Sequence, residues 1–173
     1  MIDFKPFIRD VPDFPKPGIV FKDITPLLAD AAAFRATIDR LVDPYRRRID
    51  MVLGIESRGF VIGAAAAYAL GTGLALVRKP GKLPHQTHAA RYELEYGSDA
   101  LEIHHDALGA HHRVLVIDDL LATGGTASAA VQLVRHCGGQ VVALAFVIEL
   151  AFLNGRQRLD GHAIRSLIRY DSP

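Results

Sequence analysis

The chain has 173 residues, half of them hydrophobic, so it is long enough for a substantial core and too apolar to be disordered. Its formal net charge of +1 excludes a global field that would attract nucleic acid or a membrane surface. The single cysteine, Cys137, excludes an intrachain disulfide and fits a reducing compartment. No secretory signal is visible, and the longest apolar run, residues 59–70, is too short to span a bilayer. We therefore expect one cytoplasmic domain covering residues 1–173.

The N-terminal segment, residues 4–26, holds five prolines and four phenylalanines. Proline at this density disfavours both a helix and a central strand, so we expect a stiff, extended arm. Such an arm can be a flap that packs on the domain. It can also be a platform on which a planar heterocycle stacks, with Phe21 as the aromatic ring. The residues alone leave both interpretations open.

The next two segments predict a helix and then a unit of strand, loop and helix. Residues 27–48 have apolar positions at helical spacing, with a break at Asp43-Pro44. A short buried strand at 51–55 is followed by a polar loop containing Ser57 and Arg58, and by an apolar helix at 60–70. This loop places a hydroxyl and a cation at a helix start, which by itself is only a weak indication of an anion site.

A third strand, residues 73–77, leads into a loop with three cations separated by proline and glycine, namely Arg78, Lys79 and Lys82. We expect this loop to be mobile, with residues 85–91 forming a flexible tip. Residues 92–96 alternate like a half-exposed strand.

Four histidines occur as two pairs, at 104–105 and 111–112, in a segment that predicts a turn. Neighbouring histidines on a strand would point to opposite faces, and these have no zinc-site spacing along a helix. We therefore expect surface turn residues.

Residues 113–126 give the strongest indication of a binding site. A β-branched run at 114–117 predicts a buried parallel strand, which ends in Asp118 and Asp119. The turn at 123–126, Thr-Gly-Gly-Thr, offers backbone amides, hydroxyls and a helix N-terminus to a phosphate. The carboxylates suit vicinal hydroxyls, so a phosphorylated sugar satisfies both halves. The lysine of a Walker loop is missing, and an ordinary capped turn would not account for two carboxylates at a buried strand end.

The remaining segments complete an alternating pattern. Residues 140–149 predict an apolar strand, Asn154-Gly155 a turn, and residues 163–168 a last short strand. Strands that alternate with helices predict an α/β fold with a mainly parallel central sheet flanked by helices.

The run Val-Leu-Val-Ile-Asp-Asp-Leu-Leu-Ala-Thr-Gly-Gly-Thr at 114–126 resembles the phosphoribosyl-pyrophosphate (PRPP) binding motif of the type I phosphoribosyltransferases. Three more segments resemble adenine-specific members of that family, in the same order along the chain. They are Phe-Pro-Lys-Pro-Gly-Ile-Val-Phe-Lys-Asp-Ile at 14–24, Gly-Ile-Glu-Ser-Arg-Gly-Phe at 54–60, and Leu-Glu-Tyr-Gly at 94–97. The resemblance implies a type I fold with an N-terminal hood, residues 1–28, and a flexible lid, residues 79–100.

The family's activity, as the resemblance implies it here, moves the 5-phosphoribosyl group of PRPP to adenine. The products are AMP and pyrophosphate, and C1′ is inverted through an oxocarbenium-like transition state. The implied catalytic residues are Glu95, Asp118, Asp119 and Arg58. Those for the 5-phosphate and ribose are Asp118, Asp119, Ala122, Thr123, Gly124, Gly125 and Thr126. Those for pyrophosphate are Ser57, Arg58, Arg78, Lys79 and Lys82. Those for adenine are Val20, Phe21, Lys22 and Leu150, and Tyr96 of the lid packs over the reaction centre.

The same resemblance implies magnesium bound with PRPP rather than held by direct protein ligands. It implies a homodimer in which Arg78 is a candidate to reach across the interface, and relatives often have a non-proline cis peptide near Glu56-Ser57. Two alternatives stay open on the sequence. One is a phosphoribosyltransferase for another base, such as xanthine. The other is a regulatory module that keeps the PRPP loop without the chemistry.

Overall fold

The computed structural model describes residues 3–93 and 98–173. Its centre is a five-stranded sheet in the order β4-β3-β7-β8-β9, and every neighbouring pair is parallel, as the sequence predicts. The strands are β3 Met51–Ile55, β4 Gly73–Val77, β7 Arg113–Leu121, β8 Gln140–Leu150 and β9 Ile164–Tyr170. In the register of this sheet, Met51 lies opposite Gly73 on one side and Val114 on the other.

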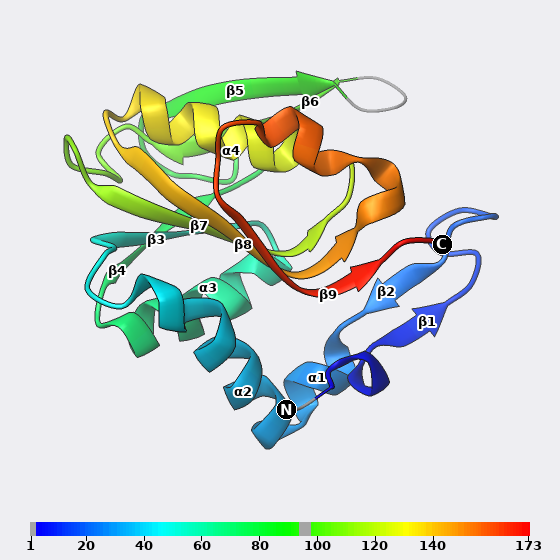
Figure 1. The fold of residues 1–173 in the computed structure, drawn as a ribbon. Helices are drawn as coiled ribbons and strands as arrows, with labels where there is room; N and C mark the ends of the chain where they lie inside the picture. The colour runs from blue at the N-terminus through cyan, green and yellow to red at the C-terminus, as the bar shows by residue number, and fades with distance from the viewer. Residues whose placement is uncertain (1–2, 94–97) are drawn as a thin grey trace.

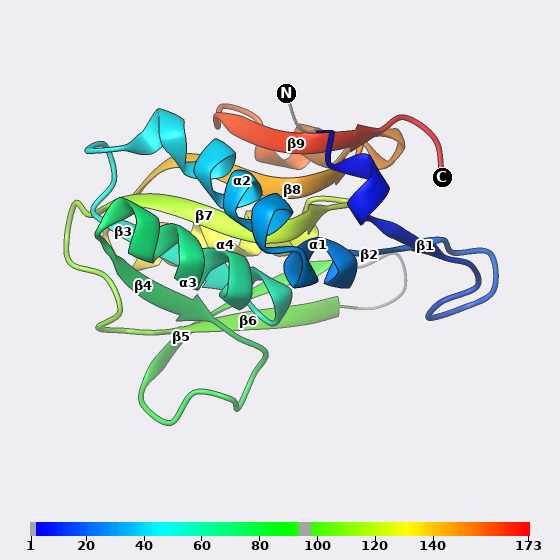
Figure 2. The ribbon, with the colours of Figure 1, turned by 90° about the horizontal axis from the view of Figure 1, so that it is seen from below.

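Helices cover both faces of the sheet (Figure 1). Helices α2 (Ala31–Val42) and α3 (Arg58–Leu70) lie on one face, as the view from below also shows (Figure 2). Helix α4 (Gly125–His136) lies on the other face, beneath the antiparallel pair of β5 (Thr87–Glu93) and β6 (Ser98–His104).

The alternation of side chains along β7 divides the core into two clusters. Val114 and Val116 belong to the cluster that includes α4, β5 and β6, whereas Leu115 and Ile117 belong to the cluster that includes α2 and α3. All four are fully buried. A strand with both faces covered needs a continuous apolar run, and residues 114–117 provide it.

The N-terminal arm is mostly extended, as expected, but it contains more local structure than the proline content predicts. It holds a 3-10 helix, η1 (Lys5–Phe7), and an antiparallel pair of β1 (Arg9–Val11) and β2 (Phe21–Asp23). Helix α1 (Thr25–Ala29) starts inside the predicted arm because Pro26 occupies its first turn, where proline is tolerated.

The single helical segment predicted over residues 27–48 is therefore wrong in its bounds. The chain breaks at Asp30, whose backbone is extended and whose carboxylate caps α2 by accepting from the amide of Ala33 at 2.8 Å. The predicted break at Asp43-Pro44 is present as a 3-10 turn, η2 (Asp43–Tyr45).

Three further predictions need correction. Strand β7 continues through Asp118 and Asp119 to Leu121, because its pairing with β8 continues that far. Residues 87–91 are not a flexible tip, since they pair with β6 as part of β5. His104 is the last residue of β6 rather than a turn residue, although His105 lies in the turn that follows.

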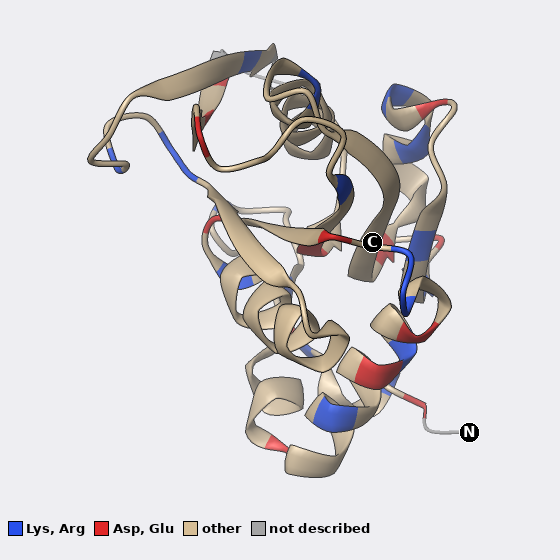
Figure 3. Cartoon of the chain, turned by 90° about the vertical axis from the view of Figure 1, so that its left-hand side faces the viewer, with Lys and Arg blue, Asp and Glu red and all other residues tan. Residues whose placement is uncertain are grey.

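The apolar helix α3 is buried on one side only, because Val61 is 46% exposed and Tyr68 is 91% exposed. In the described part of the chain, no helix combines the length and apolar character that a membrane crossing requires. Basic and acidic segments are interspersed on the side of the molecule that Figure 3 displays.

Replacing Leu115 by alanine tests the packing between β7 and the α2–α3 layer. Leu115 is 0% exposed, so we expect its truncation to lower the free energy of unfolding by about 2–5 kcal/mol. Urea unfolding followed by circular dichroism measures the loss. Leu153→Ala is the matched control, since Leu153 is 39% exposed. Equal losses in the two variants would contradict this description of the core.

Candidate active site

The loops that follow the adjacent strands β3 and β7 lie at the carboxyl ends of these strands, where the chain leaves the sheet in two different directions. From β3 the chain passes through α3 to β4 on one side, and from β7 it passes through α4 to β8 on the other. The loops that follow β3 and β7 therefore leave toward opposite faces (Figure 1). A crevice at such a reversal, outside the carboxyl ends of parallel strands, is where ligands bind in α/β sheets.

A cavity of about 300 Å³ lies at this position. Its lining brings together both predicted anion loops and the acidic pair. The predicted site residues in it are Ser57, Arg58, Lys79, Asp118, Asp119, Ala122, Thr123, Gly124, Gly125 and Thr126. It is also lined by Glu56, Tyr92 and Leu101, which the sequence reasoning did not assign to the site.

The loop at residues 122–126 runs directly into the N-terminus of α4. Gly124 adopts a left-handed conformation, with φ of 81°, before α4 begins at Gly125. This conformation favours glycine. The loop therefore lines the cavity at the N-terminus of α4, where backbone amides and the positive end of the helix dipole favour an anion.

Gly155 supports this loop from outside, and the sequence reasoning treated it only as part of a turn. It begins the 3-10 helix η4 (Gly155–Leu159), which follows η3 (Ala151–Leu153). A Cβ atom on Gly155 would lie 2.2 Å from the carbonyl oxygen of Ala122, and one on Gly124 would lie 2.4 Å from the carbonyl oxygen of Gly155. Only glycine at both positions permits this contact between backbones.

The carboxylates of Asp118 and Asp119 both line the cavity, and Asp119 is only 4% exposed. The Oδ1 atom of Asp118 accepts a hydrogen bond from the amide of Asp119 at 2.9 Å. A Cβ on Gly59 would lie 2.8 Å from that same oxygen. The first turn of α3 therefore sits against Asp118, and it can do so because residue 59 has no side chain.

The two carboxylates of the acidic pair have different surroundings. The guanidinium of Arg58 donates from Nε to Oδ2 of Asp119 and forms an ion pair with it. Burial and the neighbouring charge of Asp119 raise the pKa of Asp118 well above its usual range. Asp118 therefore retains a proton more readily than an exposed aspartate.

Two of the other predicted pyrophosphate cations, Arg78 and Lys79, are held by carboxylates of the same chain. Arg78 donates to Glu56 at 2.8 Å, which lowers the pKa of Glu56, and the Lys79 ammonium pairs with Asp99. Arg78 and Lys82 do not line the cavity, and the Lys82 carbonyl accepts from Arg78 at 3.0 Å. The peptide bond between Glu56 and Ser57 is cis, as the resemblance implied.

None of the four predicted adenine residues lines the cavity, and one of them, Phe21, contacts a residue that does. The Arg58 guanidinium lies over the Phe21 ring, 4.9 Å from its centroid, so the hood meets the site through this contact. The Lys22 side chain is buried and points away, with Nζ 2.9 Å from Asp10. Val20 and Leu150 are half-buried.

The two predicted lid residues, Glu95 and Tyr96, lie outside the described residues. The described carboxylates of the cavity are Glu56, Asp118 and Asp119, and two of them pair with arginines. This donor set suits magnesium that enters with a ligand supplying most of its oxygens, because such an ion needs few protein ligands.

Comparison with known proteins places the chain in a family. Residues 21–167 match the family model of the phosphoribosyl transferase domain. The adenine phosphoribosyltransferase of Solibacter usitatus is 60% identical over 172 residues, which is 99% of each chain.

Solved structures agree with this assignment. The adenine phosphoribosyltransferase of Thermoanaerobacter pseudethanolicus has a TM-score of 0.94 at 52% identity, with coverage of 96% of this chain and 98% of that one. The Saccharomyces cerevisiae enzyme, complexed with an imino-altritol bisphosphate and adenine, has a TM-score of 0.89 at 40% identity, with coverage of 95% and 96%. The expected type I fold is confirmed, and the chain belongs to the adenine phosphoribosyltransferases of the phosphoribosyl transferase family.

Proposed function

We propose that this chain transfers the 5-phosphoribosyl group of PRPP to adenine and releases AMP and pyrophosphate. One observation carries the proposal: a single cavity is lined by the anion-binding loop at 122–126, by the adjacent carboxylates Asp118 and Asp119, and by the cation Arg58. A pentose with a phosphate at one end and a diphosphate at the other requires these three chemistries at short range. The adenine complex of the yeast relative supports the choice of base.

Catalysis in this scheme rests on charge stabilisation. Cleavage at C1′ builds positive charge on the ribose ring, and carboxylates held beside the ring stabilise that charge. Asp118 and Asp119 hold the 2′ and 3′ hydroxyls, the amides of residues 122–126 hold the 5′-phosphate, and N9 of adenine attacks the opposite face of C1′. In the lid, Glu95 acts as the general acid/base at N7 of the purine. Tyr96 covers the reaction centre, which excludes water from PRPP.

We expect the diphosphate to bind the cationic side chains that are now paired with carboxylates. Ser57, Arg58 and Lys79 line the cavity, and Arg78 and Lys82 belong to the same loop as Lys79, residues 78–86. The diphosphate would draw Arg58 from Asp119, and Lys79 from Asp99. The same exchange frees Asp119 for a ribose hydroxyl. Magnesium bound to the diphosphate supplies further charge neutralisation.

Backbone groups of the hood read the base. Adenine stacks on Phe21, its amine donates to the Val20 carbonyl, and the Lys22 amide donates to the adjacent ring nitrogen, while Leu150 closes the pocket. The anchoring of the Lys22 ammonium by Asp10 supports this use of the backbone, because it holds the strand in place without using the cavity. A 6-oxo purine would leave buried groups unpaired, at a cost of roughly 1–3 kcal/mol for each group.

We propose further that the chain acts as one domain in the cytoplasm and as a homodimer, with Arg78 close to the interface. The free thiol of Cys137 fits a reducing compartment. Exposed apolar side chains on α3 and β4, namely Val61, Tyr68 and Leu76, support self-association.

The choice of base is tested by pyrophosphate release from PRPP with adenine, hypoxanthine, guanine and xanthine in turn. We expect kcat/KM for adenine to exceed that for each 6-oxo purine at least about 10-fold, because one unpaired buried group already costs that much. Equal rates with all four bases would reject adenine specificity. PRPP binding without any turnover would instead indicate a regulatory module.

Replacing Asp118 by asparagine separates activity from stability. We expect kcat to fall on the order of 100-fold, because a charge that stabilises the transition state is lost.

The raised pKa of Asp118 makes the parent fold lose stability as pH rises through that pKa, since the folded state binds the proton more tightly than the unfolded state. The variant should therefore be at least as stable as the parent at pH 8, with the difference vanishing toward pH 4. Urea unfolding at both pH values measures this, and unchanged turnover would remove Asp118 from the mechanism.

Replacing Gly155 by alanine tests the support of the phosphate loop. The new methyl group would overlap the Ala122 carbonyl, so the loop must shift. Its backbone amides would then no longer point together toward the phosphate. We expect KM for PRPP to rise at least about 10-fold, on the scale of a lost phosphate contact. Gln157→Ala, at an exposed position of the same turn, is the control. A parent-like KM in Gly155→Ala would show that the loop does not depend on this contact.

A further inference from the structure

A second group of chemically active side chains lies outside the cavity, where the loop before β5 meets the turn after β6. His85 belongs to the loop between β4 and β5, residues 78–86, which we call the basic loop. His105 and Asp106 form the turn directly after β6. None of the three lines the active-site cavity, and all three are exposed to solvent.

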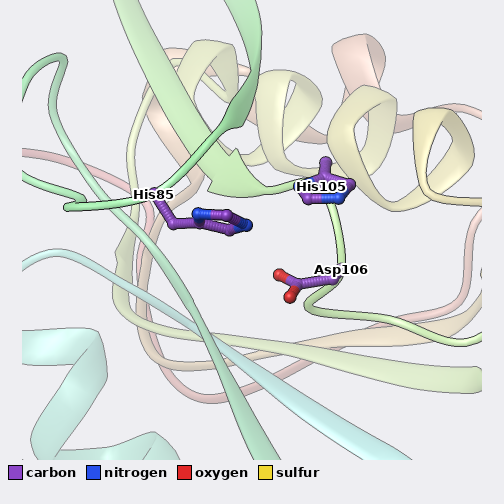
Figure 4. Close-up of side chains that lie close together, drawn as sticks. All are labelled: His85, His105 and Asp106. Atoms are coloured by element: carbon purple, nitrogen blue, oxygen red, sulfur yellow. The ribbon is translucent and has the colours of Figure 1, made fainter.

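We infer that His85, His105 and Asp106 form a zinc site that joins the basic loop to the turn after β6. One ligand atom from each residue lies within 4.8 Å of the others. Figure 4 shows the His85 ring and the Asp106 carboxylate extending toward one another, with the His105 ring beside them. A tetrahedral zinc ion, with bonds of about 2.0–2.1 Å, needs ligand atoms roughly 3.3 Å apart. Small rotations of exposed side chains close that difference.

The hydrogen bonding of His105 prepares it as a ligand. Its backbone amide donates to the carbonyl of Gln86 at 3.0 Å, and its Nδ1 lies 3.4 Å from the same oxygen. In the tautomer with the hydrogen on Nδ1, this contact is a hydrogen bond to the carbonyl oxygen, and the lone pair of Nε2 is left for a metal. This is the arrangement in which metal-binding histidines are held by their surroundings.

The His85 ring is positioned by its neighbours. Its centroid lies 5.2 Å from that of His105, and 6.1 Å from that of His104 in an edge-on contact. The Nε2 atom of His104 is buried and has no hydrogen-bond partner among the described residues, so the ring is held there by packing. The two histidines of the site therefore approach from different segments of the chain with their rings close together.

Two imidazoles and one carboxylate select the class of ion. Imidazole nitrogen favours borderline divalent metals such as zinc, whereas magnesium prefers oxygen ligands and keeps its waters. Three protein ligands leave a fourth position for water, as in open zinc sites. The bound ion would fix the end of the basic loop, which carries Arg78, Lys79 and Lys82, against the end of β6. The inference does not depend on the reaction proposed above.

Isothermal titration of the full chain, with any affinity tag removed, tests the site with zinc chloride and with magnesium chloride. We expect one zinc ion per chain, an increase in melting temperature with zinc, and neither effect with magnesium. His105→Ala and Asp106→Asn should each raise Kd for zinc at least about 100-fold, beyond the 10- to 100-fold typical of lost supporting groups. His136→Ala, which removes an exposed histidine at the end of α4, should leave Kd unchanged.

His85→Ala guards against a folding defect in His105→Ala, since His85 lies in an exposed loop and its loss should also abolish binding. The circular dichroism spectrum of each variant verifies its fold. Parent-like zinc affinity in His85→Ala and Asp106→Asn would overturn the inference, because zinc would then bind elsewhere. One ion per two chains would overturn it as well, since the site would be shared between copies.

Discussion

Two negative charges on neighbouring residues of a buried strand set the central constraint of this molecule. Asp118 and Asp119 follow one another near the end of β7, and the charge of Asp119 is one of the causes that raise the pKa of Asp118. Arg58 offsets part of the repulsion through its ion pair with Asp119, and the raised pKa of Asp118 offsets more. Arg58 can reach Asp119 because β3 lies beside β7 and α3, which follows β3, begins at Arg58.

The site also depends on backbones that approach without side chains between them. Gly59 lets the first turn of α3 rest on Asp118, and Gly155 lets η4 rest on the loop after β7. Each contact fixes one of the two anion-binding loops against a neighbouring element. The loops are therefore held in position by packed backbone rather than by flexible side chains, which suits groups that must bind phosphate with fixed geometry.

Three cations of the site, Arg58, Arg78 and Lys79, have carboxylate partners within the chain, at Asp119, Glu56 and Asp99. In the proposed reaction, binding of a diphosphate would exchange one anion for another rather than bury unpaired charge. The lid segment, residues 79–100, carries Lys79 and Asp99, and it also carries His85, which lies close to His105. A metal at His85 and His105 would act on the loop that holds the cations, so the two sites meet in one structural element.

The sequence by itself determined each unit of strand, loop and helix and the chemistry of its loop, because apolar periodicity and turn residues are local signals. It misjudged the end of β7, the break at Asp30 and the strand at 87–93, since pairing with a distant strand or a capping bond decides these. Only the tertiary structure decided that Gly155 packs on Ala122, that Arg58 pairs with Asp119, and that His85 meets His105. These residues are far apart in the chain, and a contact between distant residues leaves no periodic pattern in the sequence.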